Sequence, residues 1–148
     1  MKTSATNKKA FFDYAILEKI EAGIELRGYE VKAVKTGHIN LTGSFVVIKN
    51  NQAFLLNADI PPYQPANTPP DYDPKRTRRL LLSASEIKNL LGRTQEKNLT
   101  IIPLKVYTKG KNRLIKLEIG LGKSKKRTDK REVIKKRETD REIRRALK

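Results

Sequence analysis

The chain has 148 residues, of which 33 are Lys or Arg and 16 are Asp or Glu, so its formal net charge is +17. This length suits one domain with an appendage, and the charge favours a polyanionic partner, with nucleic acid ahead of a membrane surface. The absence of cysteine excludes disulfides, thiolate metal sites and cysteine nucleophiles, and a single histidine, His38, excludes a His-rich metal centre.

The N-terminal third predicts a strand and a short helix. Its first residues have no apolar run of signal-peptide length, and no later stretch approaches the roughly 18 apolar residues of a membrane span. We therefore expect a cytoplasmic protein that makes no membrane contact, with residues 1–8 as a flexible N-terminus. Residues 11–26 favour a strand; their apolar spacing also fits a helix, which Gly23 weakens. Residues 28–37 predict a helix of about two turns with Val31 and Val34 facing inward.

Two hairpins are indicated further along the chain. Residues 43–58 contain two β-branched or aromatic runs around Asn50-Asn51, and asparagine tolerates the positive φ of a tight hairpin turn. Residues 99–122 predict a second hairpin, whose last strand alternates apolar and polar residues and should have one face in water. Pro103 is easiest to place at an edge or a bulge.

A proline-rich stretch and a helix separate these hairpins. Residues 59–74 hold six of the seven prolines and predict an irregular surface loop. Ser83-x-x-Glu86 is a capping box, Ile87, Leu90 and Leu91 share one helical face, and Asn98 is a plausible left-handed stop. With at least five strands, the pattern predicts a mainly β fold, a small antiparallel β-barrel with accessory helices.

The C-terminal 26 residues differ in character from the rest. Residues 123–148 carry 13 Lys/Arg and 5 Asp/Glu, a net charge of +8, and their few apolar residues form no core-facing stripe. Favourable i, i+4 pairs, such as Glu132 with Lys136, nevertheless lean toward helix. We interpret 9–122 as the folded domain and 123–148 as a basic tail that is disordered alone and helical when a partner supplies the missing surface.

Catalysis is poorly supported by the residue pattern. His38 has no serine or carboxylate arrangement around it and suits an ordinary surface or nucleic-acid contact. Four glutamates at 18, 21, 25 and 30 could be imagined as an acid/base set, but no metal-ligand spacing accompanies them. We expect a protein that is not an enzyme and needs no cofactor.

Two basic clusters point to RNA. One contains Lys75, Arg76, Arg78 and Arg79, and the other begins the tail. Either cluster alone could be a solvated face, but together with the net charge they favour nucleic-acid binding. Aromatic residues are few, with five Tyr, four Phe and no Trp, so the surface suits a folded backbone better than a run of stacked bases, which favours structured RNA.

Four motifs in the same order give the chain a family resemblance. They are "YAILEKIEAGIELRGYEVKAVKTGHINL", "DPKRTRRLLL", "LIKLEIGLGK" and above all "KKRTDKREVIKKRE". From about Asn7 to Glu138 the chain resembles the SsrA-binding protein (small protein B) family. The resemblance implies an oligonucleotide-binding-type antiparallel β-barrel with accessory helices and a basic C-terminal tail.

The resemblance also implies a function that composition cannot show. Members bind the tRNA-like domain of transfer-messenger RNA and deliver it, with elongation factor Tu, to stalled ribosomes for trans-translation. The tail would enter the vacant messenger channel near the small-subunit decoding centre and fold there as a helix. We expect a monomer; the alternative from charge alone is a general basic RNA-binding barrel protein, such as a ribosomal component or RNA chaperone.

The matching motifs place the expected sites. For RNA binding they imply Glu21, Asn40, Leu81, Ser83, Lys116, Lys123 and Lys126, where the lysines suit phosphate contacts. For two of these residues a purely structural role is the alternative to RNA binding: Glu21 could pair with a lysine across the strand, and Leu81 could simply be buried.

The tail motif implies a ribosome-binding set. It comprises Thr128, Asp129, Lys130, Arg131, Ile134, Lys135 and Arg137. The sequence departs from the family at Thr128, where histidine or tyrosine is usual, at Thr139, where a bulky residue is common, and at Ser83, where asparagine is frequent. A threonine hydroxyl can hydrogen-bond but offers no π-face for stacking.

Overall fold

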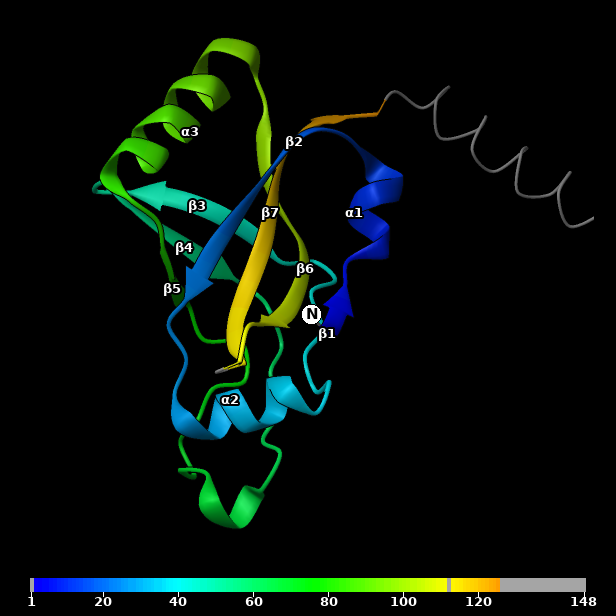
Figure 1. Ribbon diagram of the computed structural model, residues 1–148, viewed down its shortest axis with the longest axis vertical. Helices are drawn as coiled ribbons and strands as arrows, with labels where there is room; N and C mark the ends of the chain where they lie inside the picture. Colours follow the sequence, from blue (N-terminus) through cyan, green and yellow to red (C-terminus); the bar gives the residue numbers. More distant parts are fainter. Residues whose placement is uncertain (1, 112, 126–148) are drawn as a thin grey trace, which may run out of the picture.

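In the part of the chain that the structure describes, the fold is built on one antiparallel sheet of seven strands with three α-helices around it (Figure 1). The computed structural model describes residues 2–111 and 113–125. The strands are β1 Lys2–Thr6, β2 Tyr14–Ile24, β3 Phe45–Lys49, β4 Gln52–Leu56, β5 Arg78–Leu81, β6 Thr100–Lys109 and β7 Leu114–Ser124; the helices are α1 Lys8–Asp13, α2 Gly28–Lys35 and α3 Ala84–Lys97, with a 3-10 turn η1 at Pro65–Asn67. No described helix could cross a membrane, since none combines the required length with the required hydropathy.

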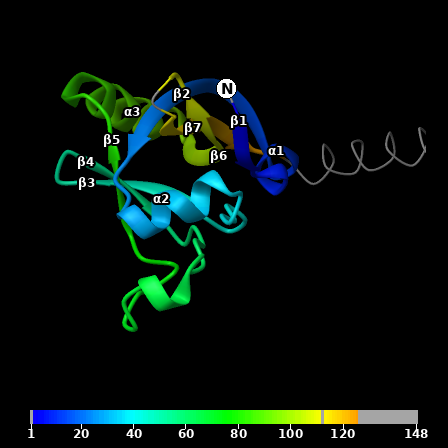
Figure 2. The same ribbon diagram turned by 60° about the horizontal axis from the view of Figure 1, so that its bottom comes forward.

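The strand order closes the sheet toward a barrel. It runs β1-β6-β7-β2-β5-β4-β3, and every pairing is antiparallel. Strand β3, at one end of this order, also contacts β6, so the sheet curves back on itself (Figures 1 and 2). The predicted mainly β architecture with accessory helices is confirmed for the described residues.

Both predicted hairpins are confirmed, and local turn chemistry specifies the first of them. Asn50 and Asn51 have φ of 52° and 59° and connect β3 to β4, as a two-residue turn with positive φ at both positions requires. Strands β6 and β7 form the second hairpin, and their register shifts between Pro103 and Lys105, so Pro103 does lie at a bulge.

The capping box of α3 is also present. The Ser83 hydroxyl accepts a hydrogen bond from the Glu86 backbone N–H at 3.2 Å, and the Glu86 carboxylate accepts from the Ser83 N–H at 3.0 Å. Asn98 ends the helix in the left-handed region, with φ 54° and ψ 39°. Both ends of this helix were therefore predictable from a few neighbouring residues.

The N-terminal region differs from the expectation in two respects. Residues 2–6, expected to be flexible, form β1 and pair with β6, and α1 begins at Lys8. Of the predicted strand 11–26, residues 11–13 belong to α1, and Tyr14–Ile24 form strand β2, which lies between β5 and β7. The expected boundary at residue 122 falls inside β7, which continues to Ser124.

One face of the last strand, β7, is exposed to solvent over only part of the strand's length. Leu117, Ile119 and Leu121 are fully buried in the main core, as expected. On the opposite face Gly120 and Gly122 are buried too, beneath a smaller core built from α1, β2 and β6. A Cβ at Gly122 would lie 2.7 Å from the Ile102 Cδ1 atom, so glycine permits this second layer. Alternation predicted the first face but not the helix that covers the second.

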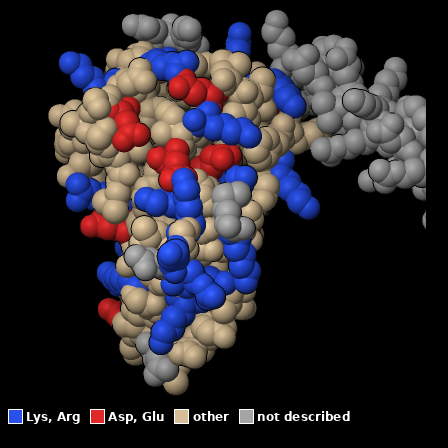
Figure 3. All heavy atoms as spheres, in the orientation of Figure 1, with Lys and Arg blue, Asp and Glu red and all other residues tan. Residues whose placement is uncertain are grey.

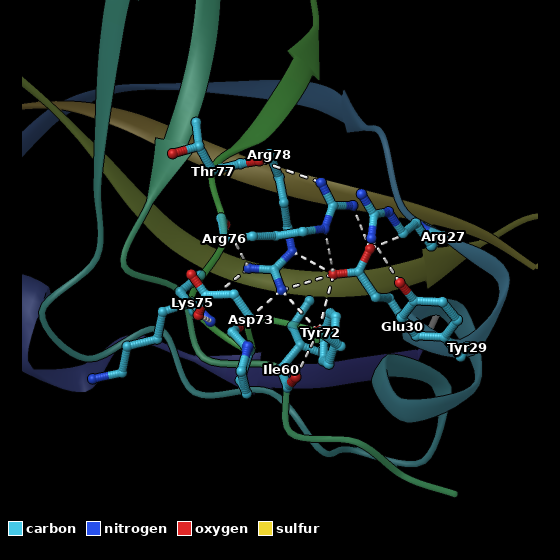
Figure 4. A network of polar contacts seen from close by, with 12 residues as sticks. Arg27, Tyr29, Glu30, Ile60, Tyr72, Asp73, Lys75, Arg76, Thr77 and Arg78 are labelled. Carbon is cyan, nitrogen blue, oxygen red and sulfur yellow. Dashed lines mark hydrogen bonds and ion pairs between the residues drawn. The ribbon is translucent and has the colours of Figure 1, made fainter. Parts of the chain in front are cut away.

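Helix α2 is present where predicted, but a charged residue takes one of its buried positions. Val34 and Ala33 are fully buried, Val31 is half-buried, and Glu30 is 1 % exposed. Glu30 is buried because two arginines from the segment before and at the start of β5 bind its carboxylate (Figure 4).

The carboxylate of Glu30 is the centre of a buried network. The Arg78 Nε donates to Glu30 Oε2 at 2.8 Å, and Arg76 donates to both carboxylate oxygens. The Tyr72 hydroxyl, from the proline-rich loop, donates to Glu30 at 3.1 Å and is also within hydrogen-bond distance of the Ile60 carbonyl. Arg78 makes further bonds to the carbonyls of Ala58 and Pro74. The network thus ties α2, the proline-rich loop and β5 together.

The pKa values follow from this geometry. Burial alone would raise the pKa of Glu30, but the hydrogen bonds from Arg76, the Arg27 N–H and Arg78 outweigh it, and the pKa is lowered. Burial and the neighbouring Glu30 carboxylate raise the pKa of Tyr72 to about 12. Glu30 is therefore ionised and Tyr72 a neutral donor at neutral pH.

Substitution of Glu30 by alanine tests the network. Glu30→Ala leaves Arg78, which is fully buried, without its counter-charge, so we expect the free energy of unfolding to fall by about 3–5 kcal/mol. Urea denaturation followed by circular dichroism measures this. The control Glu25→Ala removes an exposed glutamate near α2 and should change stability by less than about 0.5 kcal/mol. Equal effects of the two substitutions would contradict the role assigned to Glu30.

Candidate nucleic-acid interface

Three of the sequence-predicted RNA-binding residues gather where β5, β2 and β7 lie side by side. Gly23 of β2 pairs with Leu81 of β5 on one side and with Lys116 of β7 on the other. Directly paired residues project from the same face of a sheet, and Glu21, two residues before Gly23, shares that face. Strand register therefore brings together Glu21, Leu81 and Lys116, which are far apart in sequence.

Leu81 is a surface residue, so the alternative of simple burial does not hold. Its side chain is 50 % exposed and lies over Gly23, where an added Cβ would come within 3.0 Å of the Leu81 Cβ. The missing side chain of Gly23 thus makes room for a leucine that still presents half its surface to solvent. An exposed apolar group beside cations is suited to contact with a base or a ribose.

Glu21 is held by two neighbours from β6. The Tyr107 hydroxyl donates a hydrogen bond to its carboxylate, and the Lys109 Nζ lies 3.2 Å from Oε2. These contacts, with the Tyr107 hydrogen bond first, lower the pKa of Glu21. Burial and the bond to Glu21 in turn raise the pKa of Tyr107. The cross-strand lysine pairing foreseen for Glu21 exists, but the carboxylate remains exposed and ionised, able to accept a hydrogen bond from RNA.

A hollow opens beside this row of residues. It has a volume of about 310 Å³, and its apolar lining includes Ile24, Val31 and Leu114. Three cations, Lys35, Arg113 and Lys116, line it as well. The combination offers apolar contact and positive charge within one small site.

Positive charge gathers in a column on the face seen in Figure 3. Figure 3 shows Lys and Arg side chains in a column over α2 and the turn between β6 and β7, with most acidic side chains above it. The last turn of α2 carries two lysines, Lys32 and Lys35. Such a column matches the path of a phosphate backbone better than scattered charge would.

The remaining predicted residues lie around this centre or outside the described part of the chain. Ser83 is exposed and caps α3 two residues after Leu81. Asn40 lies apart, in a bridge to Asp59, and its side-chain oxygen accepts from the Thr42 N–H at 2.9 Å. Lys123 is exposed near the end of β7, opposite Ala15. Outside the described residues lie Lys126, Thr128, Asp129, Lys130, Arg131, Ile134, Lys135 and Arg137.

The basic cluster of residues 75–79 requires a correction. Its four cations were expected to contact RNA, but Arg78 is fully buried and Arg76 binds the same carboxylate of Glu30. Sequence spacing could not reveal this, because the partner lies 46 and 48 residues earlier in the chain. Lys75 and Arg79 are exposed, so half of the cluster remains open to a phosphate.

The four glutamates considered for catalysis do not converge. Glu18 forms an ion pair with Arg93, Glu21 binds Tyr107 and Glu30 binds the buried arginines. His38 is exposed; its Nδ1 lies 2.8 Å from the Thr36 hydroxyl and its ring 5.2 Å from that of Tyr63. Within residues 2–111 and 113–125, no group of three or more His, Cys, Asp or Glu could hold a metal ion.

Three residues of this surface were missed by the sequence patterns. Tyr107 looked like an ordinary strand residue, and Lys35 and Arg113 belonged to no charge cluster. Tyr107 reaches Glu21 through the register of β6 against β7, in which it pairs with Lys116. Only the register of a long hairpin, combined with that of β2, could have identified it.

Comparisons with known proteins agree with the family resemblance of the sequence motifs. The family model described as SmpB protein matches residues 4–148. The SsrA-binding protein of Thermosipho melanesiensis is 54% identical over 148 residues, which cover 100% of this chain and 99% of the relative. That of Synechocystis is 45% identical over 148 residues, covering 100% and 95%. A chain from a solved structure described as "tmRNA-SmpB: a journey to the center of the bacterial ribosome" superimposes with a TM-score of 0.68 at 38% identity, covering 88% of this chain and 93% of that one.

Substitution of Tyr107 by phenylalanine tests the geometry around Glu21. Tyr107→Phe removes the hydroxyl that stabilises the ionised carboxylate, so the pKa of Glu21 should rise toward its ordinary value. Titration of the side-chain carboxyl signal by NMR measures this. The control Tyr63→Phe changes an exposed tyrosine of the proline-rich loop and should leave the pKa of Glu21 unchanged. An unchanged value in Tyr107→Phe would show that the hydroxyl does not bind Glu21 in solution.

Proposed function

The chain belongs to the SmpB protein family, as its motifs predicted, and we propose that it binds transfer-messenger RNA and delivers it to stalled ribosomes in trans-translation. The observation that carries this proposal for the chain's own surface is the row formed by Leu81, Gly23 and Lys116, with Glu21 beside it. It combines one acceptor, one exposed apolar group and one cation on a face bordered by positive charge.

The roles of these groups follow from their chemistry. Lys116 and Lys123 pair with phosphates, which fixes the register of the RNA on the protein. The Glu21 carboxylate, held ionised, accepts a hydrogen bond from a base amino group or a ribose hydroxyl. A phosphate of the RNA cannot make this contact, because it has no hydrogen-bond donor. Leu81 packs against a ribose or against a base that has left the helical stack. The carboxylate therefore adds discrimination that cations alone do not supply.

We propose a division of labour between the two parts of the chain. Residues 9–122 hold the tRNA-like domain of the RNA, with Asn40 and Ser83 as further contacts, and Lys123 and Lys126 at the start of the tail complete this RNA surface. Residues 123–148 act on the ribosome, in the vacant messenger channel near the small-subunit decoding centre. Within the tail, Thr128, Asp129, Lys130, Arg131, Ile134, Lys135 and Arg137 make those contacts.

The cellular setting belongs to the same proposal. The protein acts as a monomer in the cytoplasm, with elongation factor Tu in the delivery complex, and it binds and positions RNA without catalysing a reaction. The anchoring of the tail root supports the connection between body and tail: the Lys125 N–H donates to the Asp13 carbonyl at 2.9 Å, and its Nζ donates to the Phe11 carbonyl at 3.1 Å. These two bonds place Lys125 next to α1.

Selective binding separates this function from that of a general basic RNA-binding protein. We expect transfer-messenger RNA to bind more tightly than an unrelated hairpin of equal length at every salt concentration, because Glu21 and Leu81 add contacts that are not counterion-dependent. Filter binding across a salt series measures both affinities. Equal affinities and equal salt slopes for the two RNAs would favour the generic binder.

Removal of the tail tests the division of labour. Deletion of residues 133–148 should leave the affinity for transfer-messenger RNA within about twofold, because the deleted segment lies beyond the proposed RNA contacts of the body. Tagging of incomplete chains on stalled ribosomes should nevertheless be abolished. An RNA-binding assay and a reconstituted tagging assay report on the two halves. A parallel loss of RNA affinity would contradict the division.

A further inference from the structure

A second hollow lies next to the one beside Leu81, and three cations converge on it. Its lining is Lys2, Lys35, Thr108, Gly110 and Arg113, and its volume is about 310 Å³. The cations come from three separate elements: β1, the last turn of α2, and the turn between β6 and β7. Lys35 and Arg113 also line the first hollow, so the two hollows adjoin.

Among the described residues, no ion pair balances the charges of this second hollow. None of its lining residues is acidic, and among the described residues no ion pair involves Lys2, Lys35 or Arg113. By contrast, the arginines that serve the fold, Arg76 and Arg78, bind a carboxylate. Like charges that converge without a counter-charge repel one another, and a bound anion relieves that repulsion. The hollow therefore suits a phosphate.

The backbone holds these cations in place. Strand β1 pairs Lys2 with Thr108, whose hydroxyl donates to the Lys2 carbonyl at 3.4 Å. Arg113 closes the β6–β7 turn with a positive φ of 50°, and its N–H donates to the Gly110 carbonyl at 3.2 Å. Arginine is uncommon in that conformation, which asparagine and glycine adopt more readily. Local turn stability therefore does not account for an arginine at this position.

The two hollows have complementary chemistry. The first has an apolar lining, including Ile24, Val31 and Leu114, and the second has cations and no acidic lining residue. Lys35 and Arg113 stand at their common border. A nucleotide has the same division, an apolar flat base joined to a charged phosphate. A base can enter such a hollow only after it leaves its stack.

We propose that the adjoining hollows form a binding site for one unstacked nucleotide of the bound RNA, with the base against Val31 and Leu114 and a phosphate on Lys2, Lys35 and Arg113. This inference rests on the proposed function and extends its surface beyond the residues that the family motifs identify. It gives β1 a part in RNA binding and makes the β6–β7 turn a phosphate contact.

The first test compares charge-removing variants of the full chain. Arg113→Asn keeps a residue that tolerates positive φ, and Lys35→Gln keeps a good helix former, so neither should disturb the fold. Each should weaken binding to transfer-messenger RNA several-fold and reduce the salt slope by about one. The matched control Lys49→Gln removes an exposed cation at the β3–β4 turn, which lines neither hollow, and should change neither quantity.

A second variant tests the base-binding half. Leu114 is 57 % exposed, so Leu114→Ser should not harm the core. It should weaken RNA binding without changing the salt slope, because an apolar contact releases no counterions. Iodine cleavage of phosphorothioate-substituted RNA then locates the site: Arg113→Asn should unmask one phosphate, or two adjacent ones, that the unsubstituted protein protects.

The outcomes separate this inference from the proposed function. If Arg113→Asn and Lys35→Gln behave like Lys49→Gln while the unsubstituted protein still prefers transfer-messenger RNA over an unrelated hairpin, the nucleotide site is wrong and the function stands. If the unsubstituted protein shows no preference between the two RNAs, the proposed function fails. If Arg113→Asn and Lys35→Gln then also reduce the salt slope equally for transfer-messenger RNA and the unrelated hairpin, the site for one unstacked nucleotide is wrong as well. Diffuse loss of protection along the whole RNA would overturn the site as well.

Discussion

The ion pair between Glu30 and Arg78 is the interaction on which the candidate RNA surface depends. It joins α2 to β5 across the edge of the barrel, and both partners have fully buried side chains. Val31 and Lys35 follow Glu30 in the same helix, and Leu81 follows Arg78 in the same strand. The hollow beside Gly23 is lined by these neighbours, so its walls hold their positions because a buried carboxylate binds two guanidinium groups. Removal of one partner leaves the other charged and desolvated, so each partner is stable in the interior only while the other is present.

Positive charge has two distinct uses in this chain. Arg76 and Arg78 serve the fold, since each hydrogen-bonds to Glu30. Lys2, Lys35 and Arg113 converge on a hollow with no acidic lining residue. The difference lies in tertiary context: a cation with a carboxylate partner offers little to RNA, whereas several cations without one create a local potential that attracts phosphate. The net charge of +17 gives the class of partner, and only the distribution of counter-charges shows which cations are available.

The candidate RNA surface depends on strand register in the same way. Leu81, Gly23 and Lys116 form one row because β2 pairs with β5 on one side and β7 on the other. A shift by one residue would send Leu81 or Lys116 to the opposite face. Register also brings Tyr107 within hydrogen-bond distance of Glu21, so that an exposed carboxylate is held ionised on a strongly basic surface. Lys125, the last residue that the structure describes, lies beside α1, where its backbone N–H donates to the Asp13 carbonyl.

The sequence by itself determined the features that depend on neighbouring residues. The Asn50-Asn51 turn, the capping box at Ser83, the Asn98 stop and the Pro103 bulge were all predictable, because each is decided by the φ and hydrogen-bonding preferences of a few adjacent residues. The tertiary structure alone decided the features that join distant segments. It paired Arg78 with Glu30, covered Gly120 and Gly122 with a second core, placed residues 2–6 in the sheet, and brought Lys2, Lys35 and Arg113 to one hollow. Such contacts depend on how the whole chain packs, and the spacing of residues along the sequence carries no record of them.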